Sequence, residues 1–347
     1  MTSLFLLVCF LVMWLMVFGV GIYYTAFVPE GQVREILLVT TLALSVTMVT
    51  WLSFAYAWAF QGRVFLDWDH LNLHSGLDLL LQMIFAMYAV TMLFAPGLGR
   101  IRWSYLLLYI PLWLLFLYVP LAYMIWNPQG WLYQIGVRDF SGGLVVHVSA
   151  GVSSWVLLKN LRKPVPHLNE LTTYQAGALY LGVILISCGW FGFNMAPAGD
   201  LNDQAFLALL NTLLAIVVGA CAYFGLNYWR TGQADLGAMM NGMVGGLVTS
   251  TAGAGYLSPL RMIMTVLISA ILVTYFIQSV NLEDPVDGVA MNALGGLIGA
   301  LMVGLWSGYW SGLALQTGAS LLTLLLSLII SYSLHILVSF LISIEEY

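Results

Sequence analysis

The chain has few charged residues for its length. Only 7% of its 347 residues are charged, and the net charge is −5, whereas a soluble domain carries about 25% charged residues. A water-soluble fold could not hide a content of 61% hydrophobic residues, and a disordered chain would need more charge. Ten scattered Lys and Arg residues also exclude a basic surface for nucleic acid. The composition therefore indicates a multi-pass membrane protein.

Cysteine is scarce as well, and no two cysteines are spaced as in a metal or redox motif. Cys9, Cys188 and Cys221 lie in separate apolar runs, so we interpret them as small buried hydrophobic side chains. No metal or organic cofactor is implied. The first apolar run, 4–27, is too long for the core of a signal peptide, and no small-residue cleavage site follows it. It is therefore interpreted as a retained first span.

Long apolar runs separated by polar breaks predict an all-α fold with about eleven transmembrane helices. A span needs about 20 mostly apolar residues. The expected ranges are 4–27, 36–60, 76–96, 102–125, 140–158, 172–194, 204–228, 236–254, 259–280, 287–308 and 313–343. No segment between them is long enough for a soluble domain, so we expect one membrane domain over 1–347.

The distribution of basic residues predicts the orientation of the chain. Loops after odd-numbered spans hold seven Lys or Arg residues and loops after even-numbered spans hold three: Arg34, Arg100, Arg102, Lys159, Arg162, Lys163 and Arg230, against Arg63, Arg138 and Arg261. Cytoplasmic loops are enriched in Lys and Arg. We therefore expect the N-terminus outside and the C-terminus inside. The membrane itself is expected to be the inner (cytoplasmic) membrane of the cell.

Two segments of the chain share one pattern. An offset of 145 residues pairs the following positions: Asp139 with Asp284, Gly143 with Gly288, His147 with Asn292, and Gly151 with Gly296. The segments open the fifth and the tenth expected spans, which enter the membrane from opposite faces. We therefore expect an inverted repeat with halves at about 1–160 and 170–310, plus an extra helix at about 313–343. Such folds place the substrate path at the repeat axis, where His147 and Asn292 should face each other.

An ionisable residue inside a span points to function. The neutral imidazole of His147 can donate and accept a hydrogen bond, so it could hold an uncharged polar molecule or pass a proton; a packing role is the alternative. Asn292 can donate and accept but cannot take up a proton. Asp139 and Asp284 either cap helices or draw cations to a pore mouth. His335 lies outside the repeat and is interpreted as a packing residue.

The segment Gly189-Trp-Phe-Gly-Phe193-Asn194 closes the sixth expected span. Aromatic residues at the end of a span are often interfacial anchors. Glycines between them favour a helix that packs closely on a neighbour and projects its rings into a lumen. Aromatic faces attract cations, each by about 0.5–2 kcal/mol.

Three motifs now point to one family. With Asp139-Phe-Ser-Gly-Gly-Leu-Val-Val-His147, Gly189-Trp-Phe-Gly-Phe-Asn194 and Asp284-Pro-Val-Asp-Gly288, the chain resembles the Amt/Mep/Rh ammonium transporter family over essentially its whole length. The resemblance implies a homotrimer in the lipid bilayer with one hydrophobic pore per subunit, and no enzyme activity. In the family, an outer site recruits ammonium over aromatic rings.

The resemblance also implies roles for single residues. Trp126 and Phe85 match the aromatic residues of the outer, substrate-binding site, and Asp139 matches the aspartate beside it. Phe85 and Phe193 match two stacked gate phenylalanines. His147 matches the first of two pore histidines.

The sequence departs from the family at several of these positions. Asn292 stands in place of the second pore histidine, and Pro197 in place of the serine of the recruitment site. The Tyr-Gly-Gly of the first span is Tyr24-Thr-Ala26. The chain stops at Tyr347, so the tail that meets PII-type regulators is nearly absent and such a partner is not expected.

Three functions are compatible with this sequence. The leading prediction is an ammonium/ammonia transporter or channel that conducts ammonia through a pore lined by His147 and Asn292. The second is a non-conducting ammonium receptor, which the changes at Pro197 and Asn292 favour and the lack of an output domain disfavours. The third is a relative that conducts another small solute, such as methylamine or carbon dioxide.

Overall fold

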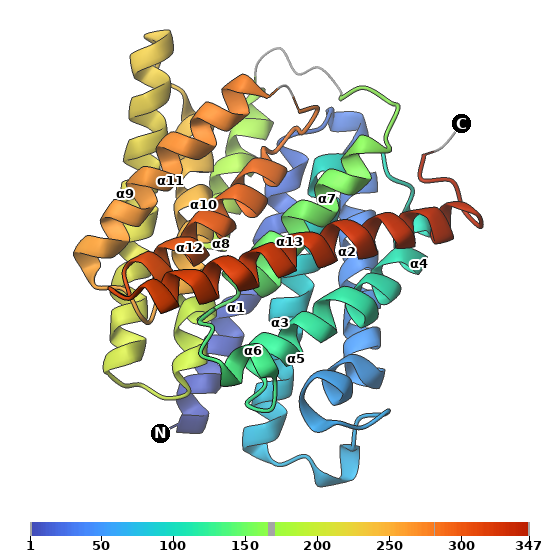
Figure 1. Ribbon diagram of the computed structural model, residues 1–347. Helices are drawn as coiled ribbons and strands as arrows, with labels where there is room; N and C mark the ends of the chain where they lie inside the picture. The colour runs from blue at the N-terminus through green and yellow to red at the C-terminus, as the bar shows by residue number, and fades with distance from the viewer. Residues whose placement is uncertain (1, 166–170, 281, 346–347) are drawn as a thin grey trace.

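A computed structural model describes residues 2–165, 171–280 and 282–345, and these residues form helices and loops without a strand (Figure 1). The helices of the first half are α1 (Thr2–Thr25), α2 (Val33–Thr50), α3 (Leu73–Phe94), α4 (Trp103–Trp113), α5 (Val119–Trp126), α6 (Trp131–Gln134) and α7 (Ser149–Lys159). Those of the second half are α8 (Thr173–Met195), α9 (Asp203–Thr231), α10 (Leu236–Ser250), α11 (Pro259–Ser279), α12 (Gly296–Leu305) and α13 (Trp310–Ser339).

Several helices continue through tighter or wider turns. Stretches of π-helix extend α2 and join α4 to α5, and others precede α7 and α12: Trp51–Ala55, Ala57–Gln61, Leu114–Tyr118, Gly143–Val148 and Ala290–Gly295. Short 3₁₀ turns lie at Glu30–Gln32, Trp68–His70, Ala95–Gly97, Ala196–Ala198 and Thr251–Gly253.

The all-helical membrane fold expected from the composition is confirmed. In the described part of the chain, eight helical segments are long and apolar enough to cross a membrane. Two shorter apolar helices span Gly143–Lys159 and Ala290–Leu305, and α10 has 15 residues. Each of the eleven expected ranges thus contains a helix, while the number of spans and their orientation stay predictions.

The helices form one bundle in which α13 lies obliquely across the face shown in Figure 1. Helix α1 begins at the bottom of this view, and α13 ends towards the upper right. The extra helix expected at 313–343 is therefore a long one that passes over helices of the first half, and it contacts α4 and α7.

Helices α1 and α8 pack closely because glycines line their contact. A Cβ atom added at Gly182 would lie 2.6 Å from the backbone N of Tyr23. One added at Gly19 would lie 2.8 Å from the Cβ of Leu185. Both distances are shorter than real side chains allow, so only glycine permits this approach, which is typical of membrane helices.

The two segments that carry the repeated pattern cross each other at Gly151 and Gly296. A Cβ at Gly151 would lie 2.8 Å from the carbonyl carbon of Asn292, and one at Gly296 would lie 2.9 Å from the Cβ of His147. The contact is reciprocal, as a two-fold axis between the halves requires. Gly142, with φ +97°, turns the chain into the first of these helices. The repeat itself stays a prediction.

The two aspartates of the pattern bind helix N–H groups, but not from the cap position. Asp139 Oδ2 accepts hydrogen bonds from the backbone N–H groups of Leu144 and Val145, both at 3.0 Å. Asp284 Oδ2 accepts from the N–H of Val289 at 2.8 Å. A cap residue bonds two or three positions ahead, whereas these carboxylates reach forward five or six positions from the loop before each helix. Asp284 alone also accepts from a closer group, the N–H of Val286, at 3.2 Å. The capping interpretation therefore needs this correction.

The interpretation of the cysteines is wrong for two of the three. Cys9 is buried, but Cys188 on α8 and Cys221 on α9 are exposed on the surface of the chain. Cysteines in apolar segments can still lie on the surface, because a membrane protein exposes apolar side chains to lipid or to neighbouring subunits.

Candidate functional site

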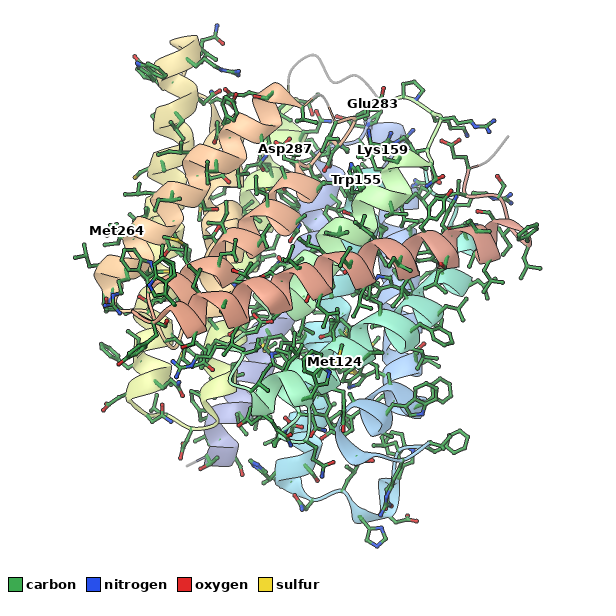
Figure 2. All side chains as sticks on the ribbon, in the orientation of Figure 1. Met124, Trp155, Lys159, Met264, Glu283 and Asp287 are labelled. Carbon is green, nitrogen blue, oxygen red and sulfur yellow. The ribbon has the colours of Figure 1, made fainter. Side chains whose placement is uncertain are left out.

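A pocket of ≈ 390 Å³ opens at the end of the bundle where α1 begins, and Leu6 lies in its wall. Its lining includes three residues identified from the sequence, Phe85, Trp126 and Asp139, together with Pro197. Figure 2 shows Met124, two residues before Trp126, on the side of the molecule away from Asp287 and Glu283. We call this pocket the outer pocket.

Trp126 is fixed at the wall of the outer pocket. Its Nε1–H donates a hydrogen bond of 2.8 Å to the backbone carbonyl of Asp139. Its ring centroid lies 5.5 Å from that of Phe85, edge to face. The indole is half-buried, so the pocket holds a rigid aromatic face that is still accessible.

Asp139, whose backbone carbonyl accepts this hydrogen bond, has only 4% of its surface exposed. The two N–H bonds described above occupy Oδ2, whereas Oδ1 is buried and has no hydrogen-bond partner among the described residues. Burial raises the pKa of this carboxyl to about 6, although the backbone N–H groups oppose the shift. A carboxylate oxygen without a donor is a site for a cation or a polar ligand.

Two phenylalanines close the inner end of the outer pocket. The ring centroids of Phe85 on α3 and Phe193 on α8 are 4.3 Å apart, and Phe193 is fully buried. One turn further along α3, Tyr88 lines a second cavity of ≈ 30 Å³. This inner cavity exceeds the 10–15 Å³ or so that one water-sized molecule needs.

His147 and Asn292 meet beneath the phenylalanines, as the sequence repeat predicts. Nδ1 of His147 lies 2.9 Å from Oδ1 of Asn292, and both side chains are buried. The amide Nδ2 of Asn292 donates to the carbonyl of Gly288 at 2.9 Å, so its Oδ1 must accept. Nδ1 of His147 then carries the proton, an assignment that follows from the hydrogen-bond network.

This tautomer leaves Nε2 of His147 as a bare acceptor. Nε2 is buried and has no partner in the part of the chain that the structure describes. The pair therefore presents one hydrogen-bond acceptor to a small molecule that reaches it. Asn292 also lines the inner cavity.

Trp190 is one residue of this site that sequence reasoning missed, although its motif was identified. Its ring stacks on the imidazole of His147, with centroids 5.5 Å apart and an angle of 5° between planes. Its Nε1 is buried without a partner among the described residues. The i, i+3 spacing of Trp190 and Phe193 places both on one face of α8, and this was the available signal.

The structure also places polar residues of α3 in the outer pocket. His74, Asp78 and Gln82 line it together with Phe85. None of the three polar residues was identified from the sequence as a site residue. Their spacing of four residues, which puts them on one helix face, is the pattern that could have revealed them.

Other polar residues lie apart from the outer pocket. His335 bonds to Tyr105 through Nδ1 at 2.9 Å, in accord with a packing role. Asp287 and Glu283 lie at the upper end of the molecule in Figure 2. Tyr24 lines the inner cavity and donates to the carbonyl of Thr91 at 2.9 Å.

The fold and these residues define an integral multi-pass membrane protein that has an aromatic outer pocket and, deeper in the bundle, a buried histidine–asparagine pair. The family model of the Ammonium Transporter Family matches residues 4–345. The chain belongs to this family.

Individual relatives agree with this assignment. The chain is 28% identical over 323 residues to an ammonium transporter of Bacillus subtilis, which covers 86% of this chain and 78% of the relative. It is 28% identical over 302 residues to a putative ammonium transporter of Methanothermobacter thermautotrophicus, covering 81% and 74% of the two chains. Both relatives are named as transporters, and membership of the transporter family agrees with the expectation that the chain is not an enzyme.

Solved structures match the fold over the whole chain. A structure named Sensor Amt Protein superposes with a TM-score of 0.90 at 21% identity, covering 100% of this chain and 95% of the other. The Mep2 protein of Saccharomyces cerevisiae gives a TM-score of 0.88 at 20% identity, covering 99% and 89%. At these identities the likeness concerns the fold. The family model and the curated relatives support ammonium transport as the general function.

Proposed function

We propose that the chain recruits ammonium in the outer pocket and conducts ammonia past Phe85 and Phe193 to His147 and Asn292. The observation that carries this proposal is the unpartnered Nε2 of His147 beneath the two rings. A bare acceptor in an aromatic, water-poor passage suits a small molecule with N–H donors. A single nitrogen acceptor cannot replace the water shell of a metal cation.

Recruitment rests on the aromatic and carboxylate groups of the outer pocket. The faces of Trp126 and Phe85 attract a cation by about 0.5–2 kcal/mol each. The free Oδ1 of Asp139 adds negative charge at the same wall. Pro197, which also lines the pocket, offers no hydroxyl as an acceptor for ammonium N–H groups.

Passage through the rings favours the neutral form. A bare cation in a dry apolar lumen costs many kcal/mol, because its water shell is not replaced. Ammonia avoids this cost, and potassium has no corresponding neutral form. The contact of Phe85 with Phe193 at 4.3 Å means that the rings must separate for each molecule, which limits the rate.

The geometry of the pair opposes proton relay. The proton on Nδ1 of His147 points at an amide oxygen that accepts it but cannot hand another proton on. A second imidazole could do so. We therefore propose that ammonia conduction through this chain is electroneutral or carries only a small proton current.

We further propose that the chain works as a homotrimer in the inner membrane, with its N-terminus outside. The family resemblance and the bias of Lys and Arg among the loops support this. Large apolar side chains exposed on α9 and α11, among them Phe206, Leu213, Ile271 and Tyr275, fit contact with lipid or with other subunits.

Reconstituted protein tests the proposal. Ammonium pulses are applied to proteoliposomes on a solid-supported membrane, and internal alkalinisation is followed in parallel with a trapped pH dye; potassium pulses and empty liposomes serve as controls. We expect ammonium-specific alkalinisation with little current. Absence of alkalinisation above that of empty liposomes would contradict conduction.

Pro197 and the closed rings favour a second function, a non-conducting ammonium receptor. In that case ammonium binds in the outer pocket and nothing passes. Saturable quenching of tryptophan fluorescence by ammonium, together with no flux in the same preparation, would support this function over the first.

A further inference from the structure

A polar stripe runs down α3 from the mouth of the outer pocket to the gate. His74, Asp78 and Gln82 follow each other at intervals of four residues, and Phe85 comes three residues later. All four line the outer pocket. Four residues of α-helix rise about 6 Å, so the stripe leads from the exposed His74 to the buried ring of Phe85 in steps that a hydrated cation can bridge.

Asp78 is held in a fixed position within this stripe. The hydroxyl of Tyr56 donates a hydrogen bond of 2.7 Å to its Oδ2. Tyr56 is itself only 4% exposed and packs against Phe60, with ring centroids 5.3 Å apart. A buried donor thus occupies one carboxylate oxygen and leaves Oδ1 for a ligand in the pocket.

Gln82 adds an acceptor one turn deeper. Its Oε1 is buried and has no hydrogen-bond partner among the described residues. A buried polar atom without a partner is rare and needs a ligand or water to satisfy it. Asp139, on the other wall of the same pocket, has an oxygen in the same condition.

The lining of the pocket is negatively charged. Among the residues described, its wall holds the carboxylates of Asp78 and Asp139, one imidazole at its exposed end and no Lys or Arg. Two carboxylates in a partly enclosed space focus the field and raise the local concentration of cations. The volume of ≈ 390 Å³ leaves room for a cation larger than ammonium.

We propose that Asp78 is a cation-binding residue of the outer pocket and that, with Gln82, it supplies the acceptors that Pro197 cannot. The ligand class is ammonium and small primary alkylammonium ions, whose N–H groups would bond to Asp78 Oδ1 and Gln82 Oε1. The inference deepens the proposed function, since it assigns a further residue to the recruitment step.

The alternative is that Asp78 only anchors Tyr56, and two variants separate these roles. Asp78→Asn keeps an oxygen to accept the Tyr56 hydrogen bond but removes the charge. Tyr56→Phe removes the hydrogen bond but keeps the charge. Asp69→Asn is the matched control, because it removes the same charge from an exposed residue in the loop before α3 that does not line the pocket.

The experiment measures the ammonium and methylammonium concentration for half-maximal flux in proteoliposomes, and binding by tryptophan fluorescence in detergent. Asp78→Asn should raise the half-maximal concentrations of both ions by about tenfold, the factor for the loss of one hydrogen bond to a charged group, while the maximal flux changes less than twofold. Asp78→Glu should recover part of the loss, and Asp69→Asn should match the native chain. The affinity of the native chain should also fall more steeply with ionic strength than that of Asp78→Asn.

The outcomes distinguish this inference from the proposed function. An unchanged affinity in Asp78→Asn, or an equal loss in Tyr56→Phe, would overturn the role of Asp78 even if the chain conducts. If the native chain binds these ions but conducts nothing, and Asp78→Asn loses the binding, the result would support the site and contradict conduction. A native chain that neither binds nor conducts these ions would contradict both.

Discussion

Restoring an imidazole at position 292 tests the central contact of the site. Asn292→His places a second titratable ring within reach of His147, where the native amide oxygen lies 2.9 Å from Nδ1. Asn292 lines the inner cavity of ≈ 30 Å³, so the additional ring atoms have space on one side. Overpacking in a close-packed interior costs about 1–3 kcal/mol, and we expect the variant to fold with reduced stability.

The expected gain follows from the hydrogen-bond roles of the pair. Each ring of a histidine pair can donate from one nitrogen and accept at the other, so a proton can enter at one ring and leave from the other. A positioned acid–base group speeds proton transfer by about 10²- to 10⁴-fold. Because gate opening also limits the rate, we expect a smaller rise, of about tenfold, in ammonium-induced current.

The assay compares peak current on a solid-supported membrane with alkalinisation of the same proteoliposomes. Asn292→Ala is the control, because it removes the acceptor without adding a ring. It leaves the Nδ1–H of His147 without its partner at a cost of about 1–3 kcal/mol. An unchanged current and flux in Asn292→His, or a native current already as large as that of the variant, would refute the reasoning.

Three other predictions follow from the same geometry. Phe193→Ala should open the gate at a cost of about 3–5 kcal/mol in stability, which thermal unfolding measures, and should admit potassium in the flux assay. Ammonium binding should weaken as the pH falls through about 6, because protonation at the raised pKa of Asp139 removes its negative charge. The same raised pKa makes the folded state more stable as the pH falls from about 6 toward 3.8, the ordinary pKa of Asp. Asp139→Asn should flatten the pH profiles of both binding and stability. Pro197→Ser should tighten ammonium binding a few-fold in the fluorescence titration, by about the net value of one hydrogen bond; unchanged binding would contradict its place in the site.

The contact between His147 and Asn292 could be predicted from the sequence, because two-fold symmetry brings equivalent residues of the two segments together at the axis. The offset that relates His147 to Asn292 needs only that two similar helices cross, and the glycines at 151 and 296 allow that crossing. The membrane fold was predictable from apolar run lengths, because each span must satisfy its own backbone hydrogen bonds as a helix.

Other features depended on contacts that leave no local pattern. Asp78 lies near the start of an expected span, where a polar residue is normally interpreted as marking the end of the membrane segment. Its partner Tyr56 lies 22 positions away in a different helix. The stacking of Trp190 on His147 depends on how α8 is rotated against the π-helical turns before α7. The outward positions of Cys188 and Cys221 likewise depend on helix rotation, which a uniformly apolar run does not specify.

The position of the charges along the path decides what the proposed pore does. The carboxylates of Asp78 and Asp139 lie outside the aromatic gate, and beyond it the path offers Nε2 of His147 and the neutral amide of Asn292. A cation is therefore concentrated at the gate but meets no charged side chain in the described wall of the inner cavity, whereas a neutral amine loses little by entering. Asn292 offers His147 a hydrogen-bond acceptor but, unlike a second imidazole, no means of proton transfer. Selectivity for the neutral species thus follows from this arrangement even without a proton current.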